Sequence, residues 1–255
     1  MNNSKTYKIA LVFLSIILML SLSVNLSAET QEGKLPTSYE PSVGLELAEI
    51  LDRPLILVLV SQYCGHCQHY KDQTLSDPEI KSLIEYHFIF SMLEISSGFD
   101  FEIPGLGEFS SFNDLSFQLG YRGTPHTSFI VNMENSWNNV ANIVGFRDKE
   151  YLKKSLRFVG AEKYKKDLDI NYYDPEENDL IDVNFEKPVK VINRDQLSFL
   201  MERWGRIEKL NQKKKKKNWQ GVEEIIISLD DEEQEKDYAH NLISNNLVQK
   251  VFIVK

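Results

Sequence analysis

Cysteine is nearly absent from this chain of 255 residues, which contains only two. A protein with one cysteine pair has no set of stabilising disulfides, so its fold must rest on a hydrophobic core. Basic residues are fewer than acidic residues: the chain has 29 Lys and Arg and 38 Asp and Glu, and its formal net charge is −9. An acidic protein is a poor nucleic-acid binder, and we predict no nucleic-acid partner. The basic run Lys213 to Lys217 is interpreted as a solvated helix end or loop, with contact to anionic lipid headgroups as the alternative.

Charge is absent from one long segment, residues 9–28, which follows Lys5 and Lys8. A positive start followed by an apolar run is typical of an export signal. At roughly 20 residues the segment is also long enough to remain as a membrane anchor. We favour cleavage after Ala28, although Leu26 is not the small residue preferred at that position before a cleavage point. Both alternatives predict an exported protein, with the periplasm as the favoured location and membrane association through residues 9–28 if the segment is retained.

The two cysteines lie together in Cys64-Gly65-His66-Cys67, after an apolar run at 54–60 that predicts a buried strand. Polar and amphipathic residues at 68–75 then predict a helix. Cys64 would lie at the start of this helix, where free N–H groups and the helix dipole stabilise a thiolate. Such motifs lower a cysteine pKa from about 8.5 into the range of about 3.5–7.5. We therefore predict a redox-active disulfide, with Cys64 as the nucleophile and Cys67 as the residue that closes the disulfide and releases a bound partner.

Two other interpretations of the cysteine pair stay open. A static structural disulfide at this spacing would close a loop too short to stabilise the fold much. A structural zinc site usually needs four protein ligands, and the sequence has no second cysteine pair, although His66, His69 and His126 could contribute. We favour the redox interpretation and predict neither a metal nor another cofactor.

The apolar pattern of residues 42–170 predicts alternating helices and strands. Residues 97–108, which are rich in Gly and aromatics, show no clear period and are expected to form a loop. Asp77-Pro78 marks a helix start. The order fits an α/β fold, a mixed sheet with helices on both faces. The expected helices are 43–51, 68–75, one from Pro78, 109–119 and 148–166, and the expected strands are 54–60, 88–95, 127–131 and 139–146.

Several motifs over residues 42–170 resemble the thioredoxin superfamily. Gly123-Thr124-Pro125, directly before a predicted strand, resembles the cis-proline loop of that family, and a proline there is otherwise hard to explain. Asp77-Pro78-Glu79, the insertion 97–112 and Gly145-Phe146 are similar to exported thioredoxin-like proteins linked to sulfur oxidation and cytochrome c maturation. The Cys-Gly-His-Cys dithiol is similar to that of protein disulfide isomerases. The resemblance implies a thioredoxin-like mixed sheet flanked by helices.

The resemblance also implies roles for residues near the dithiol. In the family, the cis-proline packs against the cysteines, and the backbone before it pairs with the substrate. Tyr63 stands where thioredoxins have Trp. The predicted catalytic residues are Cys64, Cys67, His66 and Pro125, and the predicted substrate-binding residues are Tyr63, Thr124 and His126.

Besides Tyr63, three positions depart from a thioredoxin. His66 lies between the cysteines, where an imidazolium favours the thiolate and makes the disulfide more oxidising than a Gly-Pro spacer would. His126 occupies a position where thioredoxins commonly have Thr, and it either tunes the dithiol or points into the core as a hydrogen-bonded side chain. Val58 stands where thioredoxins usually have a buried carboxylate, so proton transfer to Cys67 needs another group or water.

The remainder of the chain is expected to contain an acidic linker at 167–184 and a small C-terminal α/β extension at 185–255. The apolar residues predict strands at 189–192, 224–229 and 251–254, and a helix that starts at Asp231. Asn193 is expected to cap another helix, whose apolar face is Leu197, Leu200, Met201, Trp204, Ile207 and Leu210. The extension has no catalytic motif, so we predict a separable contact unit. The alternative is that its last strand pairs with the thioredoxin-like sheet.

These observations leave two classes of function. The leading hypothesis is an exported thiol–disulfide oxidoreductase that reduces or exchanges disulfides of partner proteins. The family resemblance favours a reductase recharged by a membrane thiol electron carrier, whereas the His66 spacer favours an oxidase or isomerase. The alternative is a non-catalytic binding module in which the C-terminal unit docks a partner.

Overall fold

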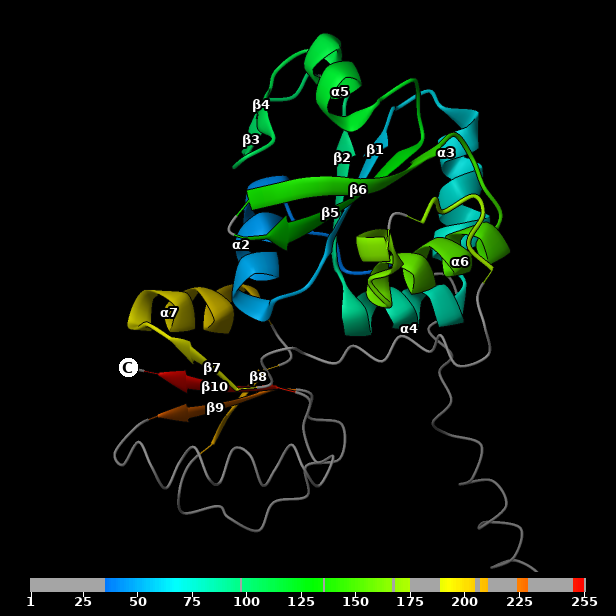
Figure 1. Cartoon of the computed structure of the whole chain (residues 1–255). Helices are drawn as coiled ribbons and strands as arrows, with labels where there is room; N and C mark the ends of the chain where they lie inside the picture. Colours follow the sequence, from blue (N-terminus) through cyan, green and yellow to red (C-terminus); the bar gives the residue numbers. More distant parts are fainter. Residues whose placement is uncertain are drawn as a thin grey trace, which may run out of the picture. The chain divides into compact units, whose positions relative to one another are not determined.

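The computed structural model shows an α/β fold built around a four-stranded mixed sheet in the order β2-β1-β5-β6 (Figure 1). It describes residues 35–174, 189–204, 207–210, 224–228 and 250–254, apart from single residues at 97, 135 and 167. The predicted signal segment, residues 1–28, lies outside the described residues. No described helix is long and apolar enough to cross a membrane.

The central strand of the sheet is β1 (Leu55–Val60). It pairs in parallel with β2 (Ile89–Glu94) and antiparallel with β5 (His126–Met133), which in turn pairs antiparallel with β6 (Ser136–Val144). All six residues of β1 are apolar and buried, as expected of a strand covered on both faces. The predicted strands at 54–60 and 88–95 are therefore confirmed to within a residue or so at each end.

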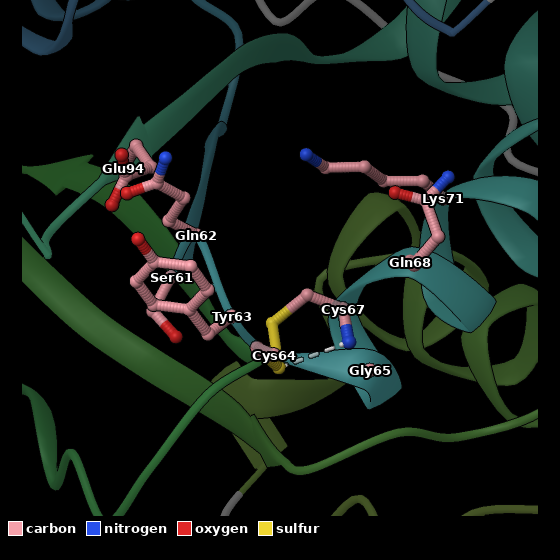
Figure 2. A pocket seen from close by; sticks show the side chains of 9 residues that line it. All are labelled: Ser61, Gln62, Tyr63, Cys64, Gly65, Cys67, Gln68, Lys71 and Glu94. Carbon is pink, nitrogen blue, oxygen red and sulfur yellow. Dashed lines mark hydrogen bonds between the residues drawn. A yellow bond between two sulfur atoms is a disulfide. The ribbon is translucent and has the colours of Figure 1, made fainter.

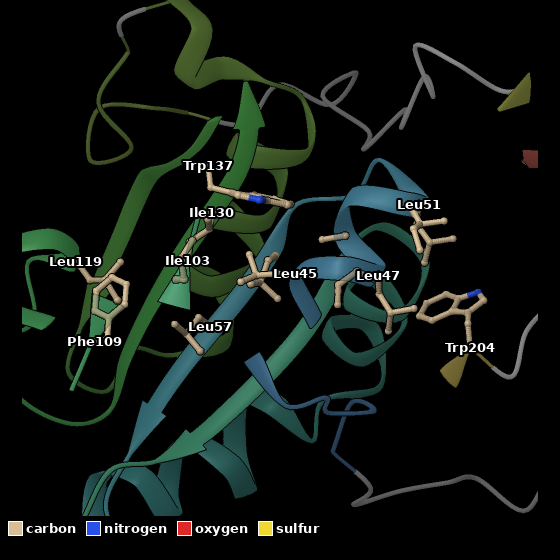
Figure 3. Close-up of a cluster of buried hydrophobic side chains, with 14 of the residues drawn as sticks. Leu45, Leu47, Leu51, Leu57, Ile103, Phe109, Leu119, Ile130, Trp137 and Trp204 are labelled. Carbon is tan, nitrogen blue, oxygen red and sulfur yellow. The ribbon is translucent and has the colours of Figure 1, made fainter. Parts of the chain in front are cut away.

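Helices cover both faces of the sheet. The helices are α2 (Pro41–Leu51), α3 (Gly65–His69), a π-helix (Tyr70–Leu75), α4 (Pro78–His87), α5 (Phe112–Leu119), α6 (Lys149–Gly160) and a short 3-10 helix (Lys163–Lys166). Side chains alternate between faces along a strand, so Leu57 joins one core cluster with α2 and α5, whereas Val58 joins the other with α3, α4 and α6. Figure 3 shows part of the first cluster. The predicted fold class is confirmed.

Local sequence signals explain where helices start. The Asp77 side chain accepts hydrogen bonds from the N–H groups of Glu79 and Ile80, and Pro78 occupies the first turn of α4. Ser111 and Asp114 form a reciprocal capping box, so α5 begins at Phe112, three residues later than predicted.

The predicted loop at 97–108 is wrong in part, because it contains a short antiparallel hairpin. Its strands are β3 (Phe101–Ile103) and β4 (Gly107–Phe109). The rings of Phe101 and Phe109 stack with their centroids 4.8 Å apart, and Ile103 and Phe109 are buried in the first core cluster. Strands of three residues are too short to show an alternating pattern in sequence.

The segment before α2 covers the free edge of β2. Tyr39 donates its backbone N–H to the carbonyl of Phe90 at 3.0 Å. The Ser38 hydroxyl oxygen accepts a hydrogen bond from the N–H of Met92 at 2.9 Å. Two backbone groups that face away from β1 are thereby satisfied without a further strand in the sheet.

The C-terminal part forms a second, parallel sheet of its own in the order β7-β10-β9-β8. Its strands are β7 (Val189–Ile192), β8 (Ile207–Leu210), β9 (Glu224–Ser228) and β10 (Lys250–Val254). The alternative in which the last strand joins the thioredoxin-like sheet is therefore wrong. The helix predicted from Asp231 lies outside the described residues.

Helix α7 (Arg194–Arg203) is capped by Asn193, as predicted, but it is shorter than expected. Ile207 and Leu210 belong to β8 instead of the helix, and Met201 is exposed. In the sequence Gly205 follows Trp204, and glycine near a helix end is a common stop signal. A spacing of three between apolar residues fits both a helix face and the start of a separate strand, which explains the error.

Residues of the second sheet and α7 pack on the end of α2. Ile192, Leu200, Trp204 and Phe252 belong to the same buried cluster as Leu47 and Leu51. Figure 3 shows Trp204 near Leu47 and Leu51. The ammonium of Lys190 donates to the carbonyl of Glu49 and to Asp52, both at 2.6 Å. That residues 185–255 are separable from residues 42–170 stays a prediction.

Candidate active site

The two cysteines form a disulfide at the junction of β1 and α3, as the motif predicted. Cys64 is the N-cap residue of α3, and its Sγ accepts a hydrogen bond from the N–H of Cys67 at 3.0 Å (Figure 2). When the pair is reduced, the same N–H favours a thiolate on Cys64 over a neutral thiol.

The two sulfur-bearing residues differ in exposure. Cys67 is only 2 % exposed and packs in the core cluster with α4 and α6, whereas Cys64 is partly exposed. A partner can therefore reach Cys64 more easily than Cys67. The roles of nucleophile and resolving residue stay predictions, and this difference supports them.

The loop before β5 faces Cys64. The Thr124–Pro125 peptide bond is cis, as the resemblance implied. The carbonyl oxygen of Thr124 lies 3.4 Å from Cys64 Sγ. Gly145 donates its N–H to the carbonyl of Pro125 at 2.9 Å and has a φ of 76°, which a residue with a side chain rarely adopts. The cysteine loop, the cis-proline loop and the end of β6 therefore meet at one place.

Ser61 is a site residue that the sequence interpretation missed. Its hydroxyl lies 3.1 Å from the hydroxyl of Thr124, so a side-chain hydrogen bond joins the cysteine loop to the cis-proline loop. The available signal is that two polar residues, Ser61 and Gln62, lie between the apolar strand and Tyr63. That signal does not reveal its partner, which is 63 residues away in the chain.

The other predicted site residues differ in how exposed their side chains are. Tyr63 is 90 % exposed, and His66 is also exposed, so both side chains are available on the surface beside Cys64. Thr124 is partly buried between the two loops, and Pro125 is buried. Their catalytic and binding roles stay predictions.

His126 lies in the core, one of the two alternatives left open by the sequence. Its imidazole is fully buried, and Nε2 donates to the carbonyl of Leu119 at 3.1 Å, with the Ser128 hydroxyl at the same distance. Burial lowers the pKa of His126, although hydrogen bonds to Leu119 and Asn142 oppose that effect. A neutral imidazole supplies no positive charge that would stabilise a thiolate on Cys64.

The position of the usual buried carboxylate is occupied by Val58, and Thr127 pairs with it on the neighbouring strand. The Thr127 hydroxyl lies 3.2 Å from the hydroxyl of Tyr70. Burial raises the pKa of Tyr70 to about 12, with the hydrogen bond to Thr127 opposing the shift. Tyr70 therefore stays protonated at neutral pH and does not replace a carboxylate as a proton acceptor for Cys67.

A pocket of about 550 Å³ lies next to the disulfide (Figure 2). Both cysteines line it, together with Ser61, Gln62, Tyr63, Gly65, Gln68, Lys71 and Glu94. Within the described ranges no group of three or more His, Cys, Asp and Glu residues is arranged to hold a metal ion.

Comparisons with known proteins agree with this architecture. Residues 40–130 match the family model described as thioredoxin-like. A comparison with curated proteins gave no match. Among solved structures, a thioredoxin from Thermus thermophilus is 21% identical over 56% of this chain and 100% of its own, with a TM-score of 0.44. A thioredoxin-fold protein from Helicobacter pylori is 16% identical over 52% of this chain and 89% of its own, with a TM-score of 0.39.

The predicted sulfur-oxidation or cytochrome c maturation subtype stays a prediction. The family match covers β1, the dithiol, β2 and the cis-proline loop. The strand order and the cis-proline beside the cysteines support the same conclusion. The chain therefore contains a thioredoxin-like domain with a disulfide, Cys64–Cys67, at the end of its central strand.

Proposed function

We propose that this protein is a thiol–disulfide oxidoreductase that acts on the disulfides and thiols of partner proteins. The observation that carries the proposal is the asymmetric disulfide, in which Cys64 is accessible and Cys67 is buried beside it. A structural staple does not need one accessible sulfur, a cis-proline carbonyl facing that sulfur and an adjoining pocket.

In the reducing direction the reaction starts from the two thiols. The Cys64 thiolate attacks one sulfur of a partner disulfide, a Cys64–partner disulfide forms, and the other partner sulfur leaves as a thiolate. The Cys67 thiolate then attacks Cys64 Sγ, which forms the Cys64–Cys67 disulfide and releases the second partner sulfur. Two electrons pass from the protein to the partner, and the protons released by Cys64 and Cys67 are balanced by those that the two partner thiolates take up from water.

The surroundings of Cys64 assist the first step. The N–H of Cys67 stabilises the attacking thiolate, as described above. The Thr124 backbone lies beside Cys64 Sγ, where we propose that it pairs with an extended segment of the partner. The hydrogen bond between Ser61 and Thr124 keeps these two loops in register for that contact.

The direction of electron flow and the location are further parts of the proposal. We propose an exported, periplasmic protein, supported by the apolar segment 9–28, and a membrane thiol carrier that restores the dithiol after each reduction. If His66 makes the disulfide oxidising, the same two steps run in reverse and the protein oxidises or rearranges partner thiols. N-terminal sequencing of protein isolated from cells tests export, because cleavage after Ala28 would leave Glu29 as the first residue.

The experiment that tests the proposal compares the wild type with two single-cysteine variants. The wild type should reduce insulin with dithiothreitol as the electron source. Cys67→Ser should accumulate a mixed disulfide with partner proteins because the resolving thiol is absent, whereas Cys64→Ser should not. Non-reducing electrophoresis followed by mass spectrometry detects the adduct.

Two results would contradict the proposal. Insulin reduction no faster than dithiothreitol alone would favour the alternative of a binding module. Trapping by Cys64→Ser and not by Cys67→Ser would reverse the assigned roles. Alkylation of the reduced protein at neutral pH gives an independent check, because Cys64 should be labelled first.

A further inference from the structure

The pocket beside the disulfide is lined by no residue of the cis-proline loop. Its lining residues come from the end of β1, the start of α3, the π-helix and the end of β2. The cis-proline loop leads into β5. Because β2 and β5 flank β1 on opposite sides, the pocket and the cis-proline loop lie on opposite sides of Cys64.

Two opposite charges face this pocket. Glu94 lies on the wall formed by the end of β2, and the side chain of Lys71 extends toward the cavity from the π-helix (Figure 2). Glu94 is already engaged, because one carboxylate oxygen accepts a hydrogen bond from the N–H of Ser96 at 2.7 Å. Hydrogen bonds from Ser96 hold the pKa of Glu94 below its usual range, so it stays ionised at neutral pH.

Lys71 is in a different situation from Glu94. Its side chain is partly buried, and no described Asp or Glu side chain lies within 4.0 Å of its ammonium group. The charge of Lys71 helps to lower the pKa of Glu94 across the pocket, but the two groups form no ion pair. The ammonium therefore offers a binding site for an anionic group that enters the pocket. In a chain with a net charge of −9, this local positive charge is a specific feature and does not reflect an overall excess of basic residues.

From this arrangement we infer that the pocket binds the side chain next to the reactive cysteine of a partner protein, and that Lys71 selects an acidic residue there. The inference rests on the proposed function, since it concerns the partner of the same disulfide. A partner sulfur that reaches Cys64 has chain on both sides of it. If one flank pairs with the Thr124 backbone, the other lies over the pocket, where its carboxylate can meet Lys71. Glu94, fixed on the opposite wall, repels a carboxylate placed on its side.

Three peptide disulfides provide the test. They differ only in the residue next to the reactive cysteine, which is Glu, Gln or Lys, and they carry no other charged side chain. An exposed ion pair contributes about 0.2–1 kcal/mol, so the wild type should reduce the Glu peptide with a kcat/KM up to about fivefold above that of the Gln peptide. The Lys peptide should be the poorest substrate, and the preference should shrink at high salt.

Variants of Lys71 complete the design. Lys71→Gln should remove the preference for Glu over Gln, and Lys71→Glu should reverse the order of the Glu and Lys peptides. Lys166→Glu makes the same charge change at an exposed residue of the 3-10 helix outside the pocket, and it should keep the wild-type order. Lys71→Gln removes the charge but keeps a polar side chain, so the test does not depend on whether Lys71→Glu folds.

Two outcomes would overturn the inference. One is equal kcat/KM for the Glu and Gln peptides with the wild type at low salt. The other is an equal shift for Lys71→Glu and Lys166→Glu, which would mean that only the overall charge matters. Failure of the proposed function would look different, because the wild type would then not reduce even the uncharged Gln peptide.

Discussion

Truncation of Trp204 probes how the C-terminal part contributes to the stability of the thioredoxin-like domain. The indole is buried, its ring centroid lies 6.0 Å from that of Tyr39, and the guanidinium of Arg53 lies 5.1 Å from it. Replacing a buried Trp by Ala typically costs about 3–5 kcal/mol through lost burial and the cavity that remains. The lost cation–π contact with Arg53, about 0.5–2 kcal/mol, is part of that total. Trp204→Ala should therefore lower the free energy of unfolding by about 3–5 kcal/mol.

The chemistry should be affected much less than the stability. Trp204 packs on the end of α2, next to the start of β1, whereas the disulfide follows the other end of that strand. A strand of six residues separates the two places by about 20 Å. Insulin reduction by folded Trp204→Ala should therefore stay close to the wild-type rate.

Urea unfolding followed by far-ultraviolet circular dichroism measures the effect. Trp204→Phe serves as the control, because it keeps an aromatic ring beside Arg53 and should lose less than half as much stability. A loss below about 1 kcal/mol in Trp204→Ala would refute the reasoning that this packing stabilises the fold. Two separate unfolding transitions would support a separable unit at 185–255, and one transition would indicate a single cooperative body.

Two further predictions concern histidines. His66→Pro should raise the pKa of the Cys64 thiol and make the disulfide harder to reduce. The reduction potential should lie in the range of roughly −270 to −180 mV. An unchanged potential in the variant would contradict the electrostatic role of His66. Burial, followed by the charge of Arg53, lowers the pKa of His87 to about 4, so the folded state excludes a proton that the unfolded state binds below about pH 6.5. The free energy of unfolding should therefore fall by about 1–2 kcal/mol, after allowance for partial exposure of His87, as the pH falls from about 6.5 to 4. His87→Gln should remove that part of the loss. Urea unfolding at both pH values measures it.

Most of the thioredoxin-like architecture could be predicted because each element carries its own local signal. The uninterrupted apolar run of β1, the Asp77-Pro78 start of α4 and the proline before β5 are readable without knowledge of the rest of the chain. The disulfide followed from the spacing of the only two cysteines. Helix boundaries are harder to predict, because a cap such as Ser111 fixes the first helical residue more tightly than the apolar pattern does.

What could not be predicted depends on contacts between distant segments. His126 is the first residue of β5, one position earlier than expected, and the start and register of a strand determine which face each side chain joins. The link between Ser61 and Thr124, and the position of Lys71 across the pocket from Glu94, arise only when separate loops meet in space. Ser61, Lys71 and Glu94 belong to no motif that a single sequence reveals.

The contacts of Ser38 and Tyr39 with β2 also bear on self-association. A strand at the edge of a sheet can pair with a strand of another molecule, and such pairing is a common start of aggregation. On β2 the N–H of Met92 and the carbonyl of Phe90 are already bonded to the preceding segment, so an incoming strand finds no continuous ladder there. Pairing of a second copy at β2 would first have to displace the segment that contains Ser38 and Tyr39.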